Sequence, residues 1–158
     1  PNLLNALARV GNGISDWHLA VAGGGPLRNN LASLTQKLGL GDRVSFLGVR
    51  NDIPDLLSAA DLFVLSSAWE GFPMVVGEAM ACEWLVVATD CGGVREFLGD
   101  SEFSVEANNF EALAAAISGA LQLTDDQRAA YGRSARERIQ ELYSQDATAD
   151  RWLAIYKG

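Results

Sequence analysis

The feature that most constrains the fold is an alternation between short apolar runs and longer stretches with the period of a helix. Four runs lie at 18–22, 43–47, 61–65 and 85–89, and a weaker fifth lies at 103–105. The first four end at glycine, serine or aspartate. Apolar strands separated by helices are typical of a parallel sheet covered on both faces. The sequence therefore predicts a doubly wound α/β domain.

The predicted helices have recognisable start and stop signals. A helix over 27–38 carries leucines on one stripe and ends at Gly39. The asparagines at 108–109 are N-cap residues for a second helix, and residues 124–127 fit a capping box that opens a polar helix to about residue 142. A last amphipathic segment carries Trp152, Ile155 and Tyr156. We expect residues 1–158 to form a single domain.

Charge and composition exclude some classes of function. The formal net charge is −8 and the pI is near 4.5, which argues against a nucleic-acid partner. No apolar run has membrane-spanning length, and no leader opens the chain. Cys82 and Cys91 form no metal-ligand pattern, and we expect them to be small buried residues in a reducing compartment. The prediction is a soluble cytoplasmic domain.

Ligands of doubly wound, Rossmann-like sheets bind outside the carboxyl ends of the strands. That rule selects the loops at 23–26, 48–52, 66–73 and 90–93. The triplet at 23–25 opens like a dinucleotide fingerprint, but Arg28 replaces the third glycine, so that motif fails.

The loop at 66–73 holds the densest set of candidate residues. Pro73 suits the first position of a helix that begins near Met74, which would leave the N–H groups of Met74 and Val75 free for a phosphate oxygen. Glu70 precedes this turn and Glu78 follows it, so the two carboxylates could flank one ligand and accept hydrogen bonds from vicinal hydroxyls. Spacing alone leaves open that both are solvated surface charges.

Four motifs resemble the signature of glycosyltransferase family 4. They are Glu-Gly-Phe-Pro at 70–73 with Glu-Ala-Met-Ala at 78–81, the glycine-rich turn at 22–27, the strand and turn at 43–48, and the strand with a Gly-Gly turn at 86–96. Family members carry two glutamates eight positions apart on the second lobe of the GT-B fold. The chain is thus similar to the C-terminal, donor-binding lobe of a group 1 glycosyltransferase.

The resemblance implies a role for each matching residue. Glu78 would bind the ribose hydroxyls of a nucleotide, and Glu70 would contact the donor sugar and stabilise charge near its anomeric carbon. Further donor-binding residues would be Gly71, Phe72, Met74 and Val75 around the sugar and diphosphate, and Val49 and Arg50 around the base.

The same resemblance implies a retaining transfer without a metal ion or cofactor, from a UDP- or GDP-type sugar to a sugar or lipid-linked acceptor. Polysaccharide or glycolipid synthesis is the expected setting, with peripheral attachment to the inner membrane as a further option. Two alternatives stay open: a non-catalytic nucleotide-binding module and another GT-B enzyme, such as a sugar-nucleotide epimerase.

The family pattern also includes parts that are missing here. Family members begin this lobe with a strand, an arginine and a lysine, and residues 1–7 resemble the segment after that lysine. We therefore expect a lobe truncated at its N-terminal side, without its acceptor lobe and inactive by itself. The missing strand would lie between those at 18–22 and 61–65. We expect another segment, another chain, or direct pairing of these two strands to fill the gap.

Overall fold

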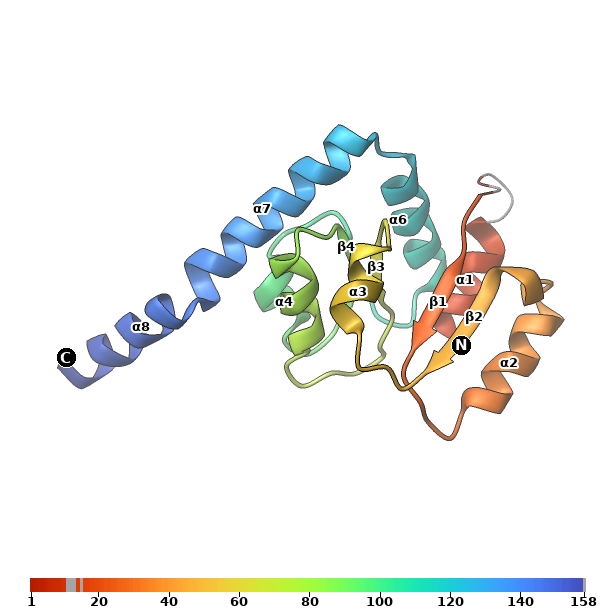
Figure 1. Cartoon of the computed structure of the whole chain (residues 1–158), viewed down its shortest axis with the longest axis horizontal. Coiled ribbons are helices and arrows are strands. Elements are labelled where there is room, and N and C mark those ends of the chain that lie inside the picture. Colours follow the sequence, from red (N-terminus) through yellow and green to blue (C-terminus); the bar gives the residue numbers. More distant parts are fainter. Residues whose placement is uncertain (11–13, 15, 158) are drawn as a thin grey trace.

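The computed structural model describes residues 1–10, 14 and 16–157. The strands are β1 (Leu19–Ala22), β2 (Val44–Gly48), β3 (Phe63–Leu65), β4 (Val86–Asp90) and β5 (Ser104–Glu106). The helices are α1 (Asn2–Val10), α2 (Arg28–Lys37), α3 (Ile53–Ser58), α4 (Met74–Ala81), α5 (Val94–Leu98), α6 (Phe110–Gln122), α7 (Asp125–Tyr143) and α8 (Gln145–Lys157), with a 3₁₀ turn at Gly41–Arg43. Figure 1 shows their arrangement.

All strand pairs are parallel, but they form two sheets rather than one. β1 pairs with β2, with Leu19 opposite Val44, and β4 pairs with both β3 and β5. We call these the two-stranded half and the three-stranded half. The α/β class with parallel strands is confirmed, whereas a single continuous sheet is not what the described residues form.

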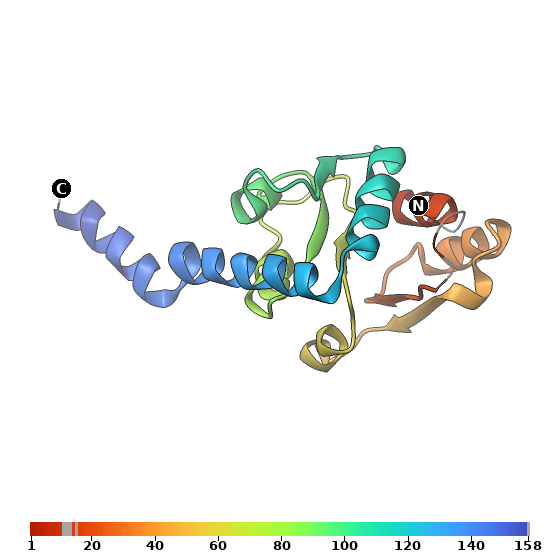
Figure 2. The same cartoon turned by 90° about the horizontal axis from the view of Figure 1, so that it is seen from above.

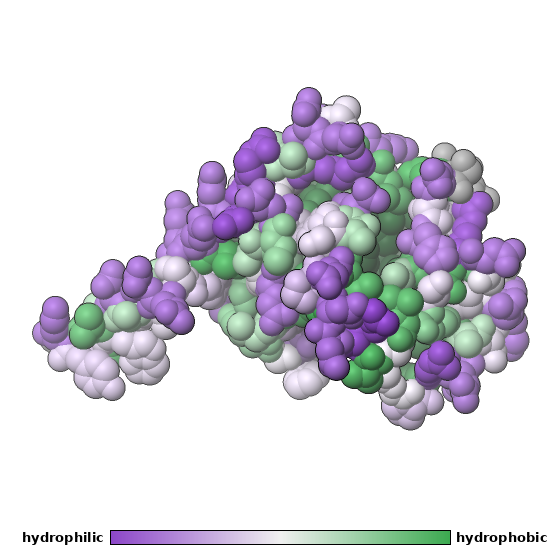
Figure 3. Space-filling model, in the orientation of Figure 1, coloured by the Kyte–Doolittle hydropathy of each residue, from purple (hydrophilic) through white to green (hydrophobic). Residues whose placement is uncertain are grey.

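The two halves meet where β1 and β3 would be neighbours, and these strands do not pair with each other. Direct pairing, one of the three expected ways to fill the gap, is therefore wrong for the structure. The orders β1-β2 and β3-β4-β5 match the two sides of a doubly wound sheet. In the view of Figure 3, apolar residues are exposed at the surface between the two halves.

Helices cover both sides of the strands and connect the two halves. Figure 2 shows α1 and α6 on one side and α3 and α7 on the other. Leu4 and Leu7 of α1 share one buried cluster with Ile117 of α6, Val44 of the two-stranded half and Val87 of the three-stranded half. Because both sheets bury side chains against this helix pair, the pair holds the halves together without a continuous ladder of strands.

Most of the predicted helix signals are confirmed. Gly39 follows α2 with a φ of 70°, a left-handed conformation that suits glycine. Asn109 caps α6 by accepting the Ala112 N–H at 2.9 Å. Thr124 and Gln127 form the capping box of α7.

The predicted burial of the two cysteines is wrong, and the last amphipathic segment is not packed against a core. Cys82 is exposed and Cys91 is half-buried, although both are free thiols as expected. The amphipathic segment is α8, but none of its residues is buried, and Ile155 and Tyr156 are 71% and 80% exposed. Figures 1 and 3 show α8 extending away from the body. Its apolar side chains therefore have no core to pack against.

None of the helices in the described ranges combines the length and apolar content needed to cross a bilayer.

Candidate functional site

The four predicted loops lie at the carboxyl ends of β1 to β4, and the structure brings them together in two pairs. In the two-stranded half, the Gly23 N–H donates to the Gly48 carbonyl oxygen at 2.7 Å. A Cβ added to Gly24 would lie 3.5 Å from Val49 Cγ2. The loops at 23–26 and 48–52 are therefore neighbours, and residues 22–30 are exposed.

In the three-stranded half, the loops at 66–73 and 90–93 are bonded more tightly. The Gly93 N–H donates to the Gly71 carbonyl oxygen at 2.8 Å. Gly92 has a φ of 54°, and a Cβ there would lie 2.0 Å from the Glu70 carbonyl oxygen. Only glycine permits this approach of the two backbones. The Gly-Gly turn thus fixes the position of the loop that carries Glu70.

A buried threonine on β4 also bonds to the backbone of the loop at 66–73. Thr89 is fully buried at the end of β4, and its hydroxyl donates to the Ser67 carbonyl oxygen at 2.6 Å. The Cys91 thiol contacts that oxygen at 3.4 Å. Neither Thr89 nor Ser67 was among the predicted site residues. The available signal was a hydroxyl residue at the carboxyl end of a strand that is otherwise apolar.

The two candidate carboxylates lie on either side of the start of α4. Glu70 is half-buried, and its Oε1 accepts the Ser67 hydroxyl at 2.6 Å. Glu78 lies in the second turn of α4 and is exposed. One carboxylate is therefore held in a fixed loop, while the other points from a helix surface into solvent, where a ligand can reach it.

The start of α4 differs in detail from the prediction. The helix begins at Met74 as expected, but Pro73 is its N-cap residue rather than its first helical residue. The Met74 N–H donates to the Phe72 carbonyl oxygen at 3.0 Å, so it is not free for a phosphate. The turn at Pro73 directs this N–H back along the chain. Val75 is left as the candidate N–H donor at this helix start.

Phe72 connects the loop to the core. Its side chain is 46% exposed, and its ring centroid lies 4.6 Å from that of the buried Phe97. The neighbouring Met74 side chain is exposed, as is Trp69. The loop thus has one aromatic anchor and presents apolar side chains to solvent on either side of it.

Val49 and Arg50, the residues predicted to frame a base, lie in the two-stranded half. Val49 is 82% exposed. Arg50 Nε donates to Asp52 Oδ1 at 2.7 Å, and its Nη2 contacts the other oxygen. The hydrogen bond from Arg50 lowers the pKa of Asp52, and the same bond raises the pKa of Arg50. No hydrogen bond or ion pair joins these residues to Glu70 or Glu78 within the described part of the chain, so the predicted site residues fall into two groups, one in each half.

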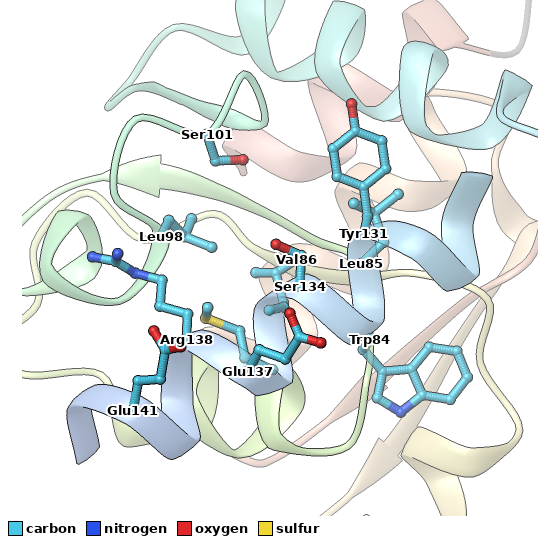
Figure 4. A pocket seen from close by; sticks show the side chains of 12 residues that line it. Trp84, Leu85, Val86, Leu98, Ser101, Tyr131, Ser134, Glu137, Arg138 and Glu141 are labelled. Atoms are coloured by element: carbon cyan, nitrogen blue, oxygen red, sulfur yellow. The ribbon is translucent and has the colours of Figure 1, made fainter. Parts of the chain in front are cut away.

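One pocket of the described residues lies at the opposite edge of the sheet, near the amino end of β4. It has a volume of about 390 Å³ and is lined by residues before β4 and along α7, among them Trp84, Tyr131 and Arg138 (Figure 4). None of the predicted site residues lines it. Among the described residues, no group of three or more histidine, cysteine or acidic side chains is arranged to hold a metal ion.

Comparison with known proteins finds a matching family model and several relatives. The family model described as "Glycosyl transferases group 1" matches residues 1–138. The lipopolysaccharide core biosynthesis mannosyltransferase LpsB of Rhizobium meliloti is 35% identical over 150 residues, which cover 90% of this chain and 43% of that protein. The chain spans about two fifths of the length of the curated relatives it matches.

Two solved structures have a similar fold. A TarM variant from S. aureus, crystallised with fondaparinux, alpha-GlcNAc-glycerol and UDP, has a TM-score of 0.87 at 25% identity, covering 99% of this chain and 32% of that one. The C-terminal domain of a group 1 glycosyl transferase (LpcC) from Francisella tularensis has a TM-score of 0.77 at 23% identity, covering 91% of this chain and 78% of that one. The second likeness is one of fold alone.

Proposed function

The chain belongs to the group 1 glycosyl transferases, and from that premise we propose that it is the donor-binding C-terminal lobe of a family 4 enzyme with the GT-B fold. The enzyme transfers a sugar from a nucleotide-diphosphate sugar to a sugar or lipid-linked acceptor, with retention of anomeric configuration. This chain supplies the donor site, and the rest of the enzyme supplies the acceptor site.

The observation that carries the proposal is the placement of Glu70. Its loop is fixed by the Gly93 N–H and by the Thr89 hydroxyl, and it lies at the carboxyl edge of the three-stranded half, where α/β sheets bind ligands. A carboxylate held in place before the ligand arrives can stabilise positive charge on a sugar ring without a reorganisation cost.

The other site residues each contact a different part of the donor. Glu78 accepts hydrogen bonds from the ribose hydroxyls, while the backbone of Gly71, Phe72, Met74 and Val75 lines the sugar and diphosphate. Since the Met74 N–H is already bonded, Val75 donates to the phosphate. Val49 and Arg50 frame the base from the two-stranded half.

Comparison supports the nature of the donor and of the lobe. The TarM complex contains UDP, which favours a UDP-type donor over a GDP-type one. The fold that the chain shares with an isolated C-terminal domain is the fold that this lobe would have. The R. meliloti relative is named for lipopolysaccharide core synthesis, which supports a role in glycolipid or polysaccharide assembly. We place the enzyme in the cytoplasm, with membrane contact made by the acceptor lobe.

The test is calorimetric titration of the chain with UDP, GDP and ADP, beside Glu78→Ala. One diphosphate should bind, and the variant should bind it about tenfold more weakly, because charged hydrogen bonds to the ribose are lost. Glu137→Ala is the matched control, since Glu137 is an exposed helical glutamate that lines the pocket at the opposite edge. It should leave binding unchanged. Absence of binding by all three diphosphates would contradict the proposal.

Glu70 can be tested on the same chain. Because Glu70 contacts the sugar and not the nucleotide, Glu70→Gln should weaken binding of UDP-glucose or another accepted UDP-sugar while leaving UDP affinity unchanged. Equal loss for UDP and the UDP-sugar would assign Glu70 to the nucleotide instead. The chain alone should transfer no sugar, since transfer needs donor and acceptor held together. Measurable turnover by the purified chain would refute that expectation.

A further inference from the structure

The loop that carries Glu70 is connected to the junction of α7 and α8 by three aromatic rings. The Phe72 ring centroid lies 4.6 Å from that of Phe97, and the Phe97 centroid lies 4.9 Å from that of Tyr143. Phe72 and Tyr143 are 6.3 Å apart. Tyr143 is the last residue of α7, and Ser144 follows it with an extended backbone before α8. These three rings, tilted to one another by 40–55° and called the stack below, therefore run from the proposed donor loop to the junction of α7 and α8. Figure 1 shows α8 projecting from the body at that junction.

The middle ring has almost no freedom to move. Phe97 is 2% exposed, and a Cβ added to Gly77 of α4 would lie 2.8 Å from its Cε1. A Cβ added to Gly93 would lie 2.6 Å from Phe72 Cδ2. Because both glycines leave space that the rings occupy, displacement of one ring displaces the next.

α7 also binds the backbone of α5 through polar contacts. The Tyr143 hydroxyl donates to the Glu96 carbonyl oxygen at 2.9 Å. Arg138 Nε donates to the Phe97 carbonyl oxygen at 2.6 Å, and its Nη2 to that of Glu96 at 3.0 Å. These carbonyls lie in the last turn of a helix, where they have no partner within it. α7 thus fixes the backbone of Phe97 as well as its ring.

We propose that Tyr143 is a positioning residue for the donor loop, and this inference rests on the proposed function. Its ring holds Phe97 and Phe72 in place, and so keeps the backbone from Glu70 to Phe72 in the geometry that binds the nucleotide sugar. Tyr143 does not touch the donor; it acts through the stack. A change in the direction of α8 at Ser144 would reach the donor loop by this route.

The test compares nucleotide affinity among variants, with UDP as the first probe. Tyr143→Leu removes the ring and should weaken UDP binding about fivefold. Tyr143→Phe keeps the ring and loses only the hydroxyl, so its affinity for UDP should stay within about twofold of the wild type. Each measurement is made at a temperature where the variant is folded. Tyr143→Met, whose longer and more flexible side chain adapts better to the space left by the ring, replaces Tyr143→Leu if the latter unfolds.

Ile139→Ala is the control for a purely structural role. Ile139 lies one turn earlier on α7 and packs against the same buried cluster, but it is not part of the stack. It should lower the melting temperature and leave UDP affinity unchanged. Wild-type affinity in Tyr143→Leu, or an equal loss in Ile139→Ala, would overturn the inference.

A double-mutant cycle tests the route itself. When Tyr143→Leu is added to Phe72→Leu, UDP affinity should fall by less than about twofold more, because the Phe72 ring through which Tyr143 acts is already gone. Fully additive losses would overturn the route through Phe72. A wild-type chain that binds none of UDP, GDP and ADP would overturn the proposed function, and this inference with it.

Discussion

The two-stranded and three-stranded halves both present loops at the carboxyl ends of parallel strands, but they hold them very differently. In the two-stranded half, one backbone hydrogen bond joins loops that are mostly exposed, and Val49 and Arg50 project from the surface. In the three-stranded half, a buried hydroxyl, a Gly-Gly turn and an aromatic stack fix the loop of Glu70. The difference teaches that the loop nearest the proposed reacting sugar, where positive charge would develop, is held by the most contacts. The loops proposed to bind the base are held by fewer.

The largest expected effect comes from forcing the two backbones of the three-stranded half apart. Gly92→Ala places a Cβ 2.0 Å from the Glu70 carbonyl oxygen at a left-handed φ. We expect a loss of about 2–4 kcal/mol in the free energy of unfolding, measured by urea denaturation. Gly25→Ala is the control in the two-stranded half, since a Cβ there meets nothing within 4 Å. It should change stability by less than about 0.5 kcal/mol. Equal losses of stability in the two variants would mean that the loops of the two halves are held equally tightly, contrary to the comparison above.

An intermediate effect is expected from two buried threonines, Thr89 on β4 of the three-stranded half and Thr35 on α2, which packs against β2. Thr89→Val leaves the Ser67 carbonyl without its 2.6 Å donor and should cost about 1–2 kcal/mol of unfolding free energy. Thr35 is equally buried, but its hydroxyl bonds to the Leu31 carbonyl of its own helix at 2.9 Å. That carbonyl keeps its helical partner, so Thr35→Val should cost less than about 0.5 kcal/mol. The opposite ranking in urea denaturation would contradict our account of how the loop is fixed.

The smallest effect concerns the ion pair of the two-stranded half. The pKa of Asp52 is lowered in the folded state by the hydrogen bond from Arg50, so the pair stabilises the fold at neutral pH. That contribution is lost as the pH falls through the lowered pKa, below the ordinary aspartate value of 3.8. Asp52→Asn should therefore lower the melting temperature slightly at neutral pH and low salt, and the difference should vanish in acid. A difference that grows in acid would have the wrong sign.

The sequence predicted the fold class and several helix boundaries well, because those depend on local signals. The cap at Asn109 and the left-handed Gly39 follow from residue type and spacing alone. The four loops were found by a rule that applies to every parallel sheet. Two predictions failed for different reasons. The Met74 N–H is taken by a local turn at Pro73, a backbone conformation that residue type did not reveal, whereas the exposure of Cys82 depends on tertiary packing. The lack of a core beneath α8 is likewise a tertiary feature that its apolar pattern does not show. Thr89 was missed because its function is to bond a carbonyl that lies 22 positions away.

The exposed α8 has a thermodynamic consequence of its own. The helix has 13 residues and buries none of them, so tertiary packing contributes little to its helicity. Peptide helices of that length are only marginally populated in water. On warming, we therefore expect the circular dichroism signal of α8 to fade gradually, well before the sharp transition of the body. The chain would then have two melting regimes, and a single fitted enthalpy would underestimate the cooperativity of its folded core.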